Sequence, residues 1–143
     1  MTTVAYAAVT QSGLSFDRQL WMRPEIIPGL RRLTDAIHAE GAAAGIQLGH
    51  CGNMSHKSIC GCMPVGASSG FNLYSPTFVR GLRADELPEM ARAYGRSVNL
   101  AREAGFDSVE IHAGHGYLIS QFLSPSTNHR KDEFGGSLQN RMR

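Results

Sequence analysis

The stretch DSVEIHAGHGYLISQF, residues 107–122, decides the fold and carries most of the candidate chemistry. Its first part, residues 107–113, is a short apolar run between glycines, which is typical of a buried strand. Apolar and polar side chains alternate along this run, so the apolar ones share one face and the polar ones the other. Two imidazoles, His112 and His115, and the phenol of Tyr117 follow where the strand gives way to a loop.

Residues 43–49 and 3–9 also predict strands, helical periodicity appears in two further segments, and a third helix is expected to start near the C-terminus. The expected buried positions are Ile26, Leu30, Leu33 and Ile37 in the first helix and Leu87, Met90, Tyr94, Val98 and Ala101 in the second. The expected helix ends are a cap at Gly41 for the first helix, Asp85 and Gly105 for the second, and Ser137 as the start of the third.

Strand, helix, strand, helix, strand, helix is the order of a parallel α/β protein. Gln47 and His112 lie on the polar face of their strands, toward the carboxyl ends. This pattern favours part of a (β/α)8 TIM barrel, whose active site lies at that end, over a Rossmann-like sheet. No G-x-G-x-x-G joins a strand to a helix. Residues 50–83 are expected to form a long loop on the active-site side.

Composition narrows the class of protein. The formal net charge is +2 and the basic residues are scattered, which argues against a nucleic-acid partner. The chain has no apolar run long enough to span a membrane. An odd count of three cysteines, with no secretory signal at residues 1–10, predicts a cytoplasmic protein.

Three interpretations of the histidine pair remain open from the residues alone. His112 and His115 could fill the barrel interior, bind zinc together with Cys60 and Cys62, or donate hydrogen bonds to a substrate. The C-x-C at 60–62 has no second matching pair, which weakens the zinc interpretation. Two donors at a carbonyl oxygen would stabilise the charge that develops when a hydride is added to an activated alkene. Tyr117 would then protonate the α-carbon.

A family resemblance favours the last interpretation. The sequence EIHAGHGYLISQFLSPSTNHRKDEFGGSLQNRMR, residues 110–143, closely resembles the signature of the Old Yellow Enzyme family of flavin-dependent ene-reductases. RRLTDAIHAEGAAAGIQLGHCGN, residues 31–53, resembles an upstream segment of the same family. The resemblance is weakest across residues 51–83, where Asn53 stands at a position that is commonly arginine in the family.

The resemblance implies FMN as cofactor and NADH or NADPH as reductant, and the spacing of the cysteines and histidines predicts no metal site in this chain. His112 and His115 would hold the carbonyl oxygen of a small enone or enoyl substrate, and Tyr117 would be the proton donor. Gln47 would hydrogen-bond the pyrimidine edge of the flavin, and the segment around Ala7 would pack near the isoalloxazine. His50 would support the site from behind. Asn128, Arg130, Asp132 and Glu133 would pin the loop that precedes Ser137.

The length disagrees with a whole barrel, which typically needs about 250 residues. We therefore expect residues 1–143 to be a fragment of a flavin-binding TIM-barrel domain, roughly its strands two to four with their helices. Such a fragment is expected to be inactive alone, and the full-length form could be a homo-oligomer. The alternatives are a non-catalytic remnant or binding fragment and, with less support, a zinc-binding module that uses Cys60, Cys62 and histidines.

Overall fold

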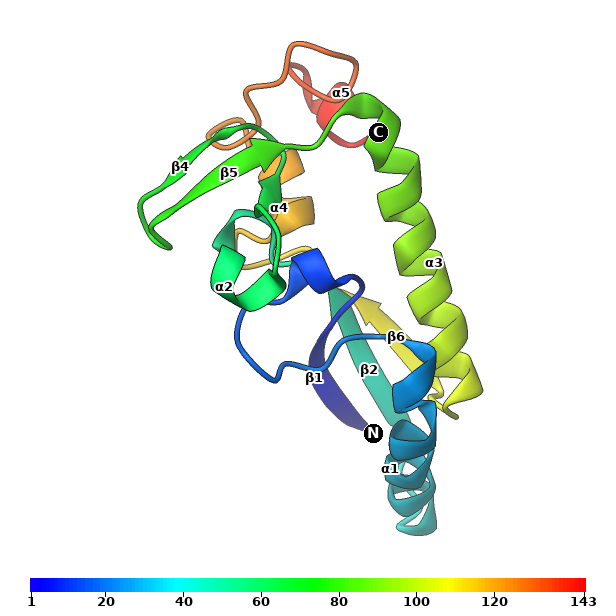
Figure 1. Ribbon diagram of the computed structural model, residues 1–143. Helices are drawn as coiled ribbons and strands as arrows, with labels where there is room; N and C mark the ends of the chain where they lie inside the picture. The colour runs from blue at the N-terminus through cyan, green and yellow to red at the C-terminus, as the bar shows by residue number, and fades with distance from the viewer.

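The central sheet has three parallel strands. In the computed structural model, which describes residues 1–143, these are β1 (Thr2–Ala8), β2 (Ala44–Gly49) and β6 (Ser108–Ile111), in the order β1-β2-β6 (Figure 1). Strand β2 lies in the middle, and its residue Gln47 is paired with Glu110 of β6. Each strand is followed by a helical segment, which confirms the predicted α/β class. The observed strand boundaries lie within two residues of the predicted ones.

Two long helices cover one face of this sheet (Figure 1). They are α1 (Ile27–Ala39) and α3 (Leu87–Glu103), and each begins after a 3-10 turn, η2 (Pro24–Ile26) or η4 (Ala84–Glu86). Each has a proline in its first turn, where no intrahelical amide partner is needed. Gly41 and Gly105 follow the helices at φ +73° and +88°. These left-handed glycines confirm the two predicted C-terminal caps.

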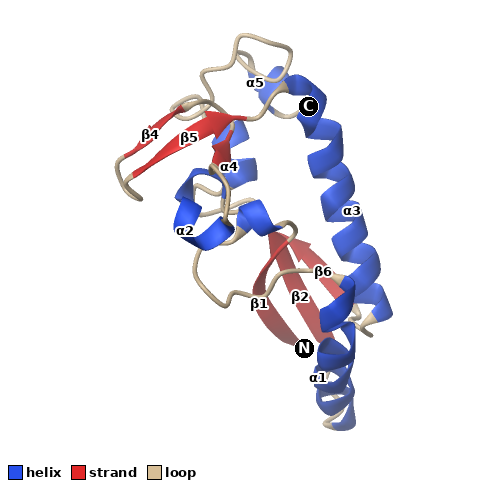
Figure 2. Cartoon of the chain, in the orientation of Figure 1, coloured by secondary structure: helices blue, strands red, loops and turns tan.

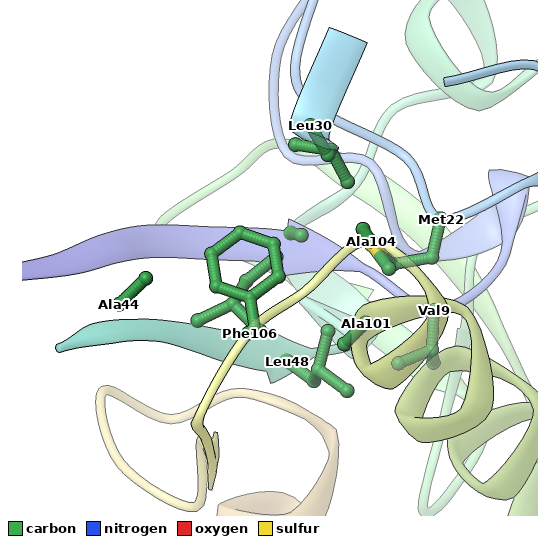
Figure 3. Packing of buried hydrophobic residues seen from close by; sticks show 10 residues of the cluster. Val9, Met22, Leu30, Ala44, Leu48, Ala101, Ala104 and Phe106 are labelled. Atoms are coloured by element: carbon green, nitrogen blue, oxygen red, sulfur yellow. The ribbon is translucent and has the colours of Figure 1, made fainter. Parts of the chain in front are cut away.

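The hydrophobic core lies between the sheet and these helices (Figure 3). Ile46 and Leu48 of β2 have no exposed surface, and Phe106 packs over them from the turn that leads into β6. The remaining members of the cluster are Ala7, Val9, Met22, Leu30, Ala44, Ala101 and Ala104. The predicted apolar face of β2 is therefore confirmed, and the opposite face carries Gln47.

The buried stripes of α1 and α3 differ in part from the prediction. Leu33 is 40% exposed and Val98 is 37% exposed, whereas Thr34 and Ser97 are buried. Small side chains let the helices approach closely, and both buried hydroxyls are satisfied. Thr34 Oγ1 donates to the carbonyl of Ala104 at 2.7 Å, and Ser97 donates within its own helix.

The predicted N-cap at Asp85 is wrong, because Asp85 lies inside η4. Arg83 precedes the turn, and its backbone N–H donates to the Glu86 carboxylate at 2.7 Å. The Asp85 carboxylate accepts from the Arg83 guanidinium at 3.0 Å instead. The sequence does not distinguish which acidic residue caps this helix, because the Glu86 carboxylate can accept from a free backbone N–H at the same helix end from inside the turn.

Residues 50–83, for which the sequence predicts a long loop, carry short elements of their own (Figure 2). These are η3 (Gly52–Met54), α2 (Lys57–Cys60), β3 (Val65–Gly66), β4 (Gly70–Asn72) and β5 (Thr77–Gly81). The strands form a second, small sheet in the order β3-β5-β4. Its β4–β5 hairpin projects away from the central sheet and exposes Phe71 and Phe78, whose rings are 5.1 Å apart.

The remaining elements are short: η1 (Gln11–Gly13), α4 (Leu118–Leu123) and α5 (Leu138–Arg141). Ser137 caps α5 as predicted, with its hydroxyl accepting from the Asn140 amide. Ile111, expected in the apolar layer, is 45% exposed because it lies in an open apolar groove of about 420 Å³ between α3 and α4. None of the helices has both the length and the hydropathy that a membrane span requires.

The Thr34 hydroxyl gives a test of this packing. Thr34→Val keeps the shape but leaves the Ala104 carbonyl without its buried donor, so we expect a loss of about 1–3 kcal/mol of unfolding free energy. Urea unfolding followed by circular dichroism measures it. Leu33→Ala, at the neighbouring exposed position, is the control and should cost about 0.5 kcal/mol or less. Equal losses in the two variants would contradict this account.

Candidate active site

The candidate site lies in the loop between β6 and α4, at the carboxyl end of the central sheet. The amide of His112 donates to the Leu48 carbonyl at 2.8 Å, which extends the ladder and fixes this imidazole against β2. His115 has a left-handed backbone at φ +56°, a rare conformation for a residue with a Cβ. Gly116 follows at φ +68°, and Tyr117 then forms the N-terminal boundary of α4. The loop is thus tightly coiled.

This coil brings the three predicted catalytic residues together. His115 Nδ1 and His112 Nε2 are 3.0 Å apart and share a hydrogen bond. The Tyr117 ring is 5.1 Å from that of His112 and nearly perpendicular to it, at 83°. His112 is buried, Tyr117 is half-buried and His115 is exposed. Two ring nitrogens therefore converge at a point that solvent can reach.

Burial and the nearby His115 lower the pKa of His112 below its usual range. A neutral imidazole carries one N–H and one acceptor nitrogen, so only one of the two rings donates in the observed hydrogen bond. The arrangement can offer donors to a ligand oxygen without carrying a full charge. This fits an interaction that strengthens as negative charge develops on that oxygen.

Tyr6 of β1 adds a fourth ring to this cluster. Its hydroxyl donates to the Gly13 carbonyl at 2.6 Å, and burial raises its pKa far above the ordinary value. The ring lies 5.2 Å from Tyr117 and packs so close to Gly49 that a Cβ there would meet it at 2.4 Å. The Tyr6 phenol is therefore neutral, and its hydrogen bond and packing hold the ring in place beside Tyr117. Sequence reasoning placed it only within a segment near the flavin.

Gln47 lies on the face of the sheet opposite the helices and is half-buried. Its side-chain amide donates to Glu110 of β6 at 2.7 Å. Ala7, the other predicted cofactor contact, is fully buried in the core cluster. Its methyl group therefore faces the helices, and only its backbone could meet a ligand on the Gln47 face.

His50 lies behind the site and is completely buried. Its Nδ1 accepts from the Gly52 amide at 3.0 Å, so the proton of the neutral ring is on Nε2, which lies 3.0 Å from the Ser12 hydroxyl. Its backbone carbonyl accepts from Leu118 at the start of α4. This placement is that of a structural support and keeps His50 away from any ligand.

Gln121 of α4 is a site residue that sequence reasoning missed. It is 1% exposed, and its Nε2 lies within hydrogen-bonding distance of Gly116, Cys51 and Asn53 oxygens, at 2.6, 3.3 and 2.9 Å respectively. It therefore ties the loop of His115 to the loop after β2. The available signal was a lone amide within the apolar run LISQFL.

Arg130 pins the loop that precedes α5, as the resemblance implied. Its guanidinium donates to the backbone carbonyls of Ala67 and Leu82 and to Asp132, with a distance of 2.9 Å between Nε and the carboxylate. Asn128 donates to two carbonyls of its own loop. Glu133 lies outside this network and pairs with Arg143 at 3.3 Å.

The cysteines and histidines do not assemble in the way that the zinc alternative requires. Cys60 and Cys62 are adjacent, but no group of three or more His, Cys, Asp or Glu side chains has a geometry suited to a metal. His56, the nearest candidate in sequence, is bonded to Ser75 at 2.6 Å.

Residues 1–143 match the family model described as "NADH:flavin oxidoreductase / NADH oxidase family". A "4,4'-dithiodibutanoate disulfide reductase" from Rhodococcus erythropolis is 41% identical over 99% of this chain and 35% of its own length. An "NADPH dehydrogenase" from Listeria monocytogenes is 44% identical over 88% of this chain and 36% of its own length.

Two solved structures share the fold. An old yellow enzyme homologue from Zymomonas mobilis superimposes with a TM-score of 0.92 at 32% identity, over 98% of this chain and 43% of the other. Morphinone reductase in complex with tetrahydroNAD superimposes with a TM-score of 0.90 at 28% sequence identity. The match covers 97% of this chain and 44% of the other. The chain thus spans about two fifths of the proteins it matches, and its fold is that of part of their TIM barrel.

His50 generates a prediction for pH. Burial lowers its pKa from 6.5 to about 4, so between these values the unfolded chain binds a proton that the folded chain does not. The contribution to stability is therefore complete above pH 6.5 and is lost as the pH falls toward 4, at up to about 1.4 kcal/mol per unit. Urea unfolding between pH 7.5 and 5.5 should show the slope. His50→Gln should reduce it, and an unchanged slope would refute the assignment.

Proposed function

The chain belongs to the NADH:flavin oxidoreductase / NADH oxidase family, and from this premise we propose that it supplies part of the active site of an FMN-dependent ene-reductase. The reaction would reduce the C=C bond of α,β-unsaturated carbonyl or enoyl compounds with NADH or NADPH. The observation that supports this is the convergence of His112 and His115, 3.0 Å apart, beside Tyr117. We expect the reaction to take place in the cytoplasm.

The two imidazoles would bind the carbonyl oxygen of the substrate. To do so they exchange their mutual hydrogen bond for two N–H···O bonds of about 2.9 Å each. Charge builds on this oxygen as the β-carbon gains a hydride, so both hydrogen bonds strengthen in the transition state. The lowered pKa of His112 suits this task, because a fixed positive charge would also bind the substrate carbonyl before reaction.

Tyr117, which lies beside His112, would protonate the α-carbon of the substrate. Its ring is held between Tyr6 and His112, at 5.2 and 5.1 Å, which limits its motion. Tyr6 is tied by its own hydroxyl to Gly13 and so is not available as the donor. A positioned acid of this kind typically accelerates a reaction by about 10²–10⁴-fold.

The residues on the sheet face fit a flavin. Gln47 presents a carboxamide, which can donate and accept at once, as the pyrimidine edge of FMN requires. Gly49, on the same face, leaves room for the Tyr6 ring, which lies next to this surface. The segment around Ala7 would back the ring through its main chain. Bound FMN would supply the hydride.

An organic disulfide is a second candidate substrate. The Rhodococcus relative, named for the reduction of 4,4'-dithiodibutanoate, is 41% identical over 99% of this chain. A reductase of this kind would share the flavin and the nicotinamide reductant. Assays should therefore include this disulfide beside an enone such as 2-cyclohexenone.

The histidine pair is testable in a chimera in which this chain replaces the matching 36% of the Listeria NADPH dehydrogenase. Changing His112 and His115 to Ala together should lower kcat/KM for 2-cyclohexenone by about 10²–10³-fold. NADPH oxidation by oxygen should persist, since it develops no enolate charge on a substrate oxygen. His129→Ala, at an exposed position, is the control. A double variant with full enone activity would overturn the role.

Tyr117 is testable in the same chimera. Tyr117→Phe keeps the ring and removes the proton, so enone turnover should fall by about 10²-fold or more while NADPH oxidation by oxygen persists. Tyr74→Phe, at a residue that is 92% exposed, should change neither rate. Normal enone turnover in Tyr117→Phe would show that the proton comes from elsewhere.

A further inference from the structure

The C-x-C at residues 60–62 has no part in the proposed reaction, yet the fold places its two sulfurs together. Cys60 ends α2, and Gly61 follows with a left-handed backbone at φ +73°. This reversal turns Cys62 back toward the helix, so that the two sulfur atoms are 3.6 Å apart. A glycine is suited to that position because a Cβ would strain the turn.

The environments of the two thiols differ. Cys60 is 1% exposed, and its sulfur lies 3.1 Å from the backbone carbonyl of Cys62. Cys62 is exposed and lines an open pocket of about 530 Å³ next to Ser12 and Arg80. A reagent in solution can therefore reach Cys62 but not Cys60. This is the arrangement of an attacking thiol with a resolving thiol behind it.

A disulfide between them needs only a small movement. The sulfurs must approach by about 1.5 Å to reach the bonding distance of about 2.05 Å. Because Cys60 and Cys62 are two residues apart in sequence, their Cα atoms are separated by no more than about 7 Å, which is near the upper limit for a disulfide. The turn at Gly61 shortens that separation. The backbone already holds the pair close to the oxidised geometry.

We propose that Cys60 and Cys62 form a redox-active dithiol that exchanges with low-molecular-weight disulfides such as oxidised glutathione. Cys62 loses its proton and attacks one sulfur of the disulfide, the S–S bond breaks, and one thiolate leaves and takes up a proton. Cys60 then loses its proton and attacks the Cys62 sulfur, which releases the second thiol. The protein loses two electrons and two protons, and the small disulfide becomes two thiols.

Cys51 is the internal comparison for this pair. It is also free, but it is fully buried, and its sulfur lies 3.2 Å from the Leu14 carbonyl. Burial raises the pKa of the Cys51 thiol to about 12. The pKa of the exposed Cys62 thiol is raised to about 11, by partial desolvation of its sulfur and by the neighbouring Cys60 thiol. Exchange at neutral pH is therefore slow, so the test needs excess oxidant and mildly alkaline buffer.

The test uses the intact chain, reduced, freed of reductant and incubated with excess oxidised glutathione at about pH 8.5. Mass spectrometry should show a loss of about 2 Da, and peptide mapping should join Cys60 to Cys62. After unfolding in denaturant, two of the three thiols of the oxidised chain should be unreactive toward a thiol reagent, and both should return on reduction. Circular dichroism before and after oxidation checks that the chain stays folded.

Variants assign each role. Cys51→Ser should still lose about 2 Da, whereas Cys62→Ser, at an exposed position, should not. Cys60→Ala should stop at the mixed disulfide, a gain of about 305 Da on Cys62. A wild-type chain that stays reduced, that stops at this adduct, or that forms a disulfide with Cys51 would overturn the proposal.

Discussion

Strand β2 is the constraint on which the rest of the structure depends. It is paired on both edges, and its three apolar side chains, Ala44, Ile46 and Leu48, are completely buried. Because all three strands run parallel, their carboxyl ends meet at one edge of the sheet. The Leu48 carbonyl holds His112, and the His50 carbonyl holds the start of α4. The backbone of β2 and of His50 directly after it therefore positions the loop that carries the candidate site.

Side-chain hydrogen bonds also hold the loops at the carboxyl edge of the sheet. Gln121 has two amide hydrogens and three oxygens within reach, so its side chain can serve as a shared anchor for both loops at the carboxyl edge. Tyr6 closes the aromatic cluster from β1. Gln121 is buried and Tyr6 half-buried, and both are hydrogen-bonded, whereas His115 is exposed. A small number of internal hydrogen bonds thus fixes the loops at the carboxyl edge of the sheet.

Most of the central fold could be predicted from sequence, because its signals are local. Apolar runs marked the strands, and Gly41, Gly105 and Ser137 marked helix ends through their own backbone or side-chain chemistry. The three residues of the site loop are also close in sequence, so their grouping was predictable. What could not be predicted depends on distant partners. Gln121 is satisfied by residues up to 70 positions away, and Thr34 is buried against the end of another helix.

The left-handed backbone at His115 restricts which amino acids natural selection can place there. Most L-residues disfavour that hand, and glycine, asparagine, aspartate and histidine tolerate it best. Glycine has no side chain, and ionised aspartate has no hydrogen to give. Under the proposed role, in which this side chain donates to a ligand oxygen, histidine and asparagine are the residue types that suit both the backbone and the ligand, so that chain geometry and ligand chemistry would act together at a single position.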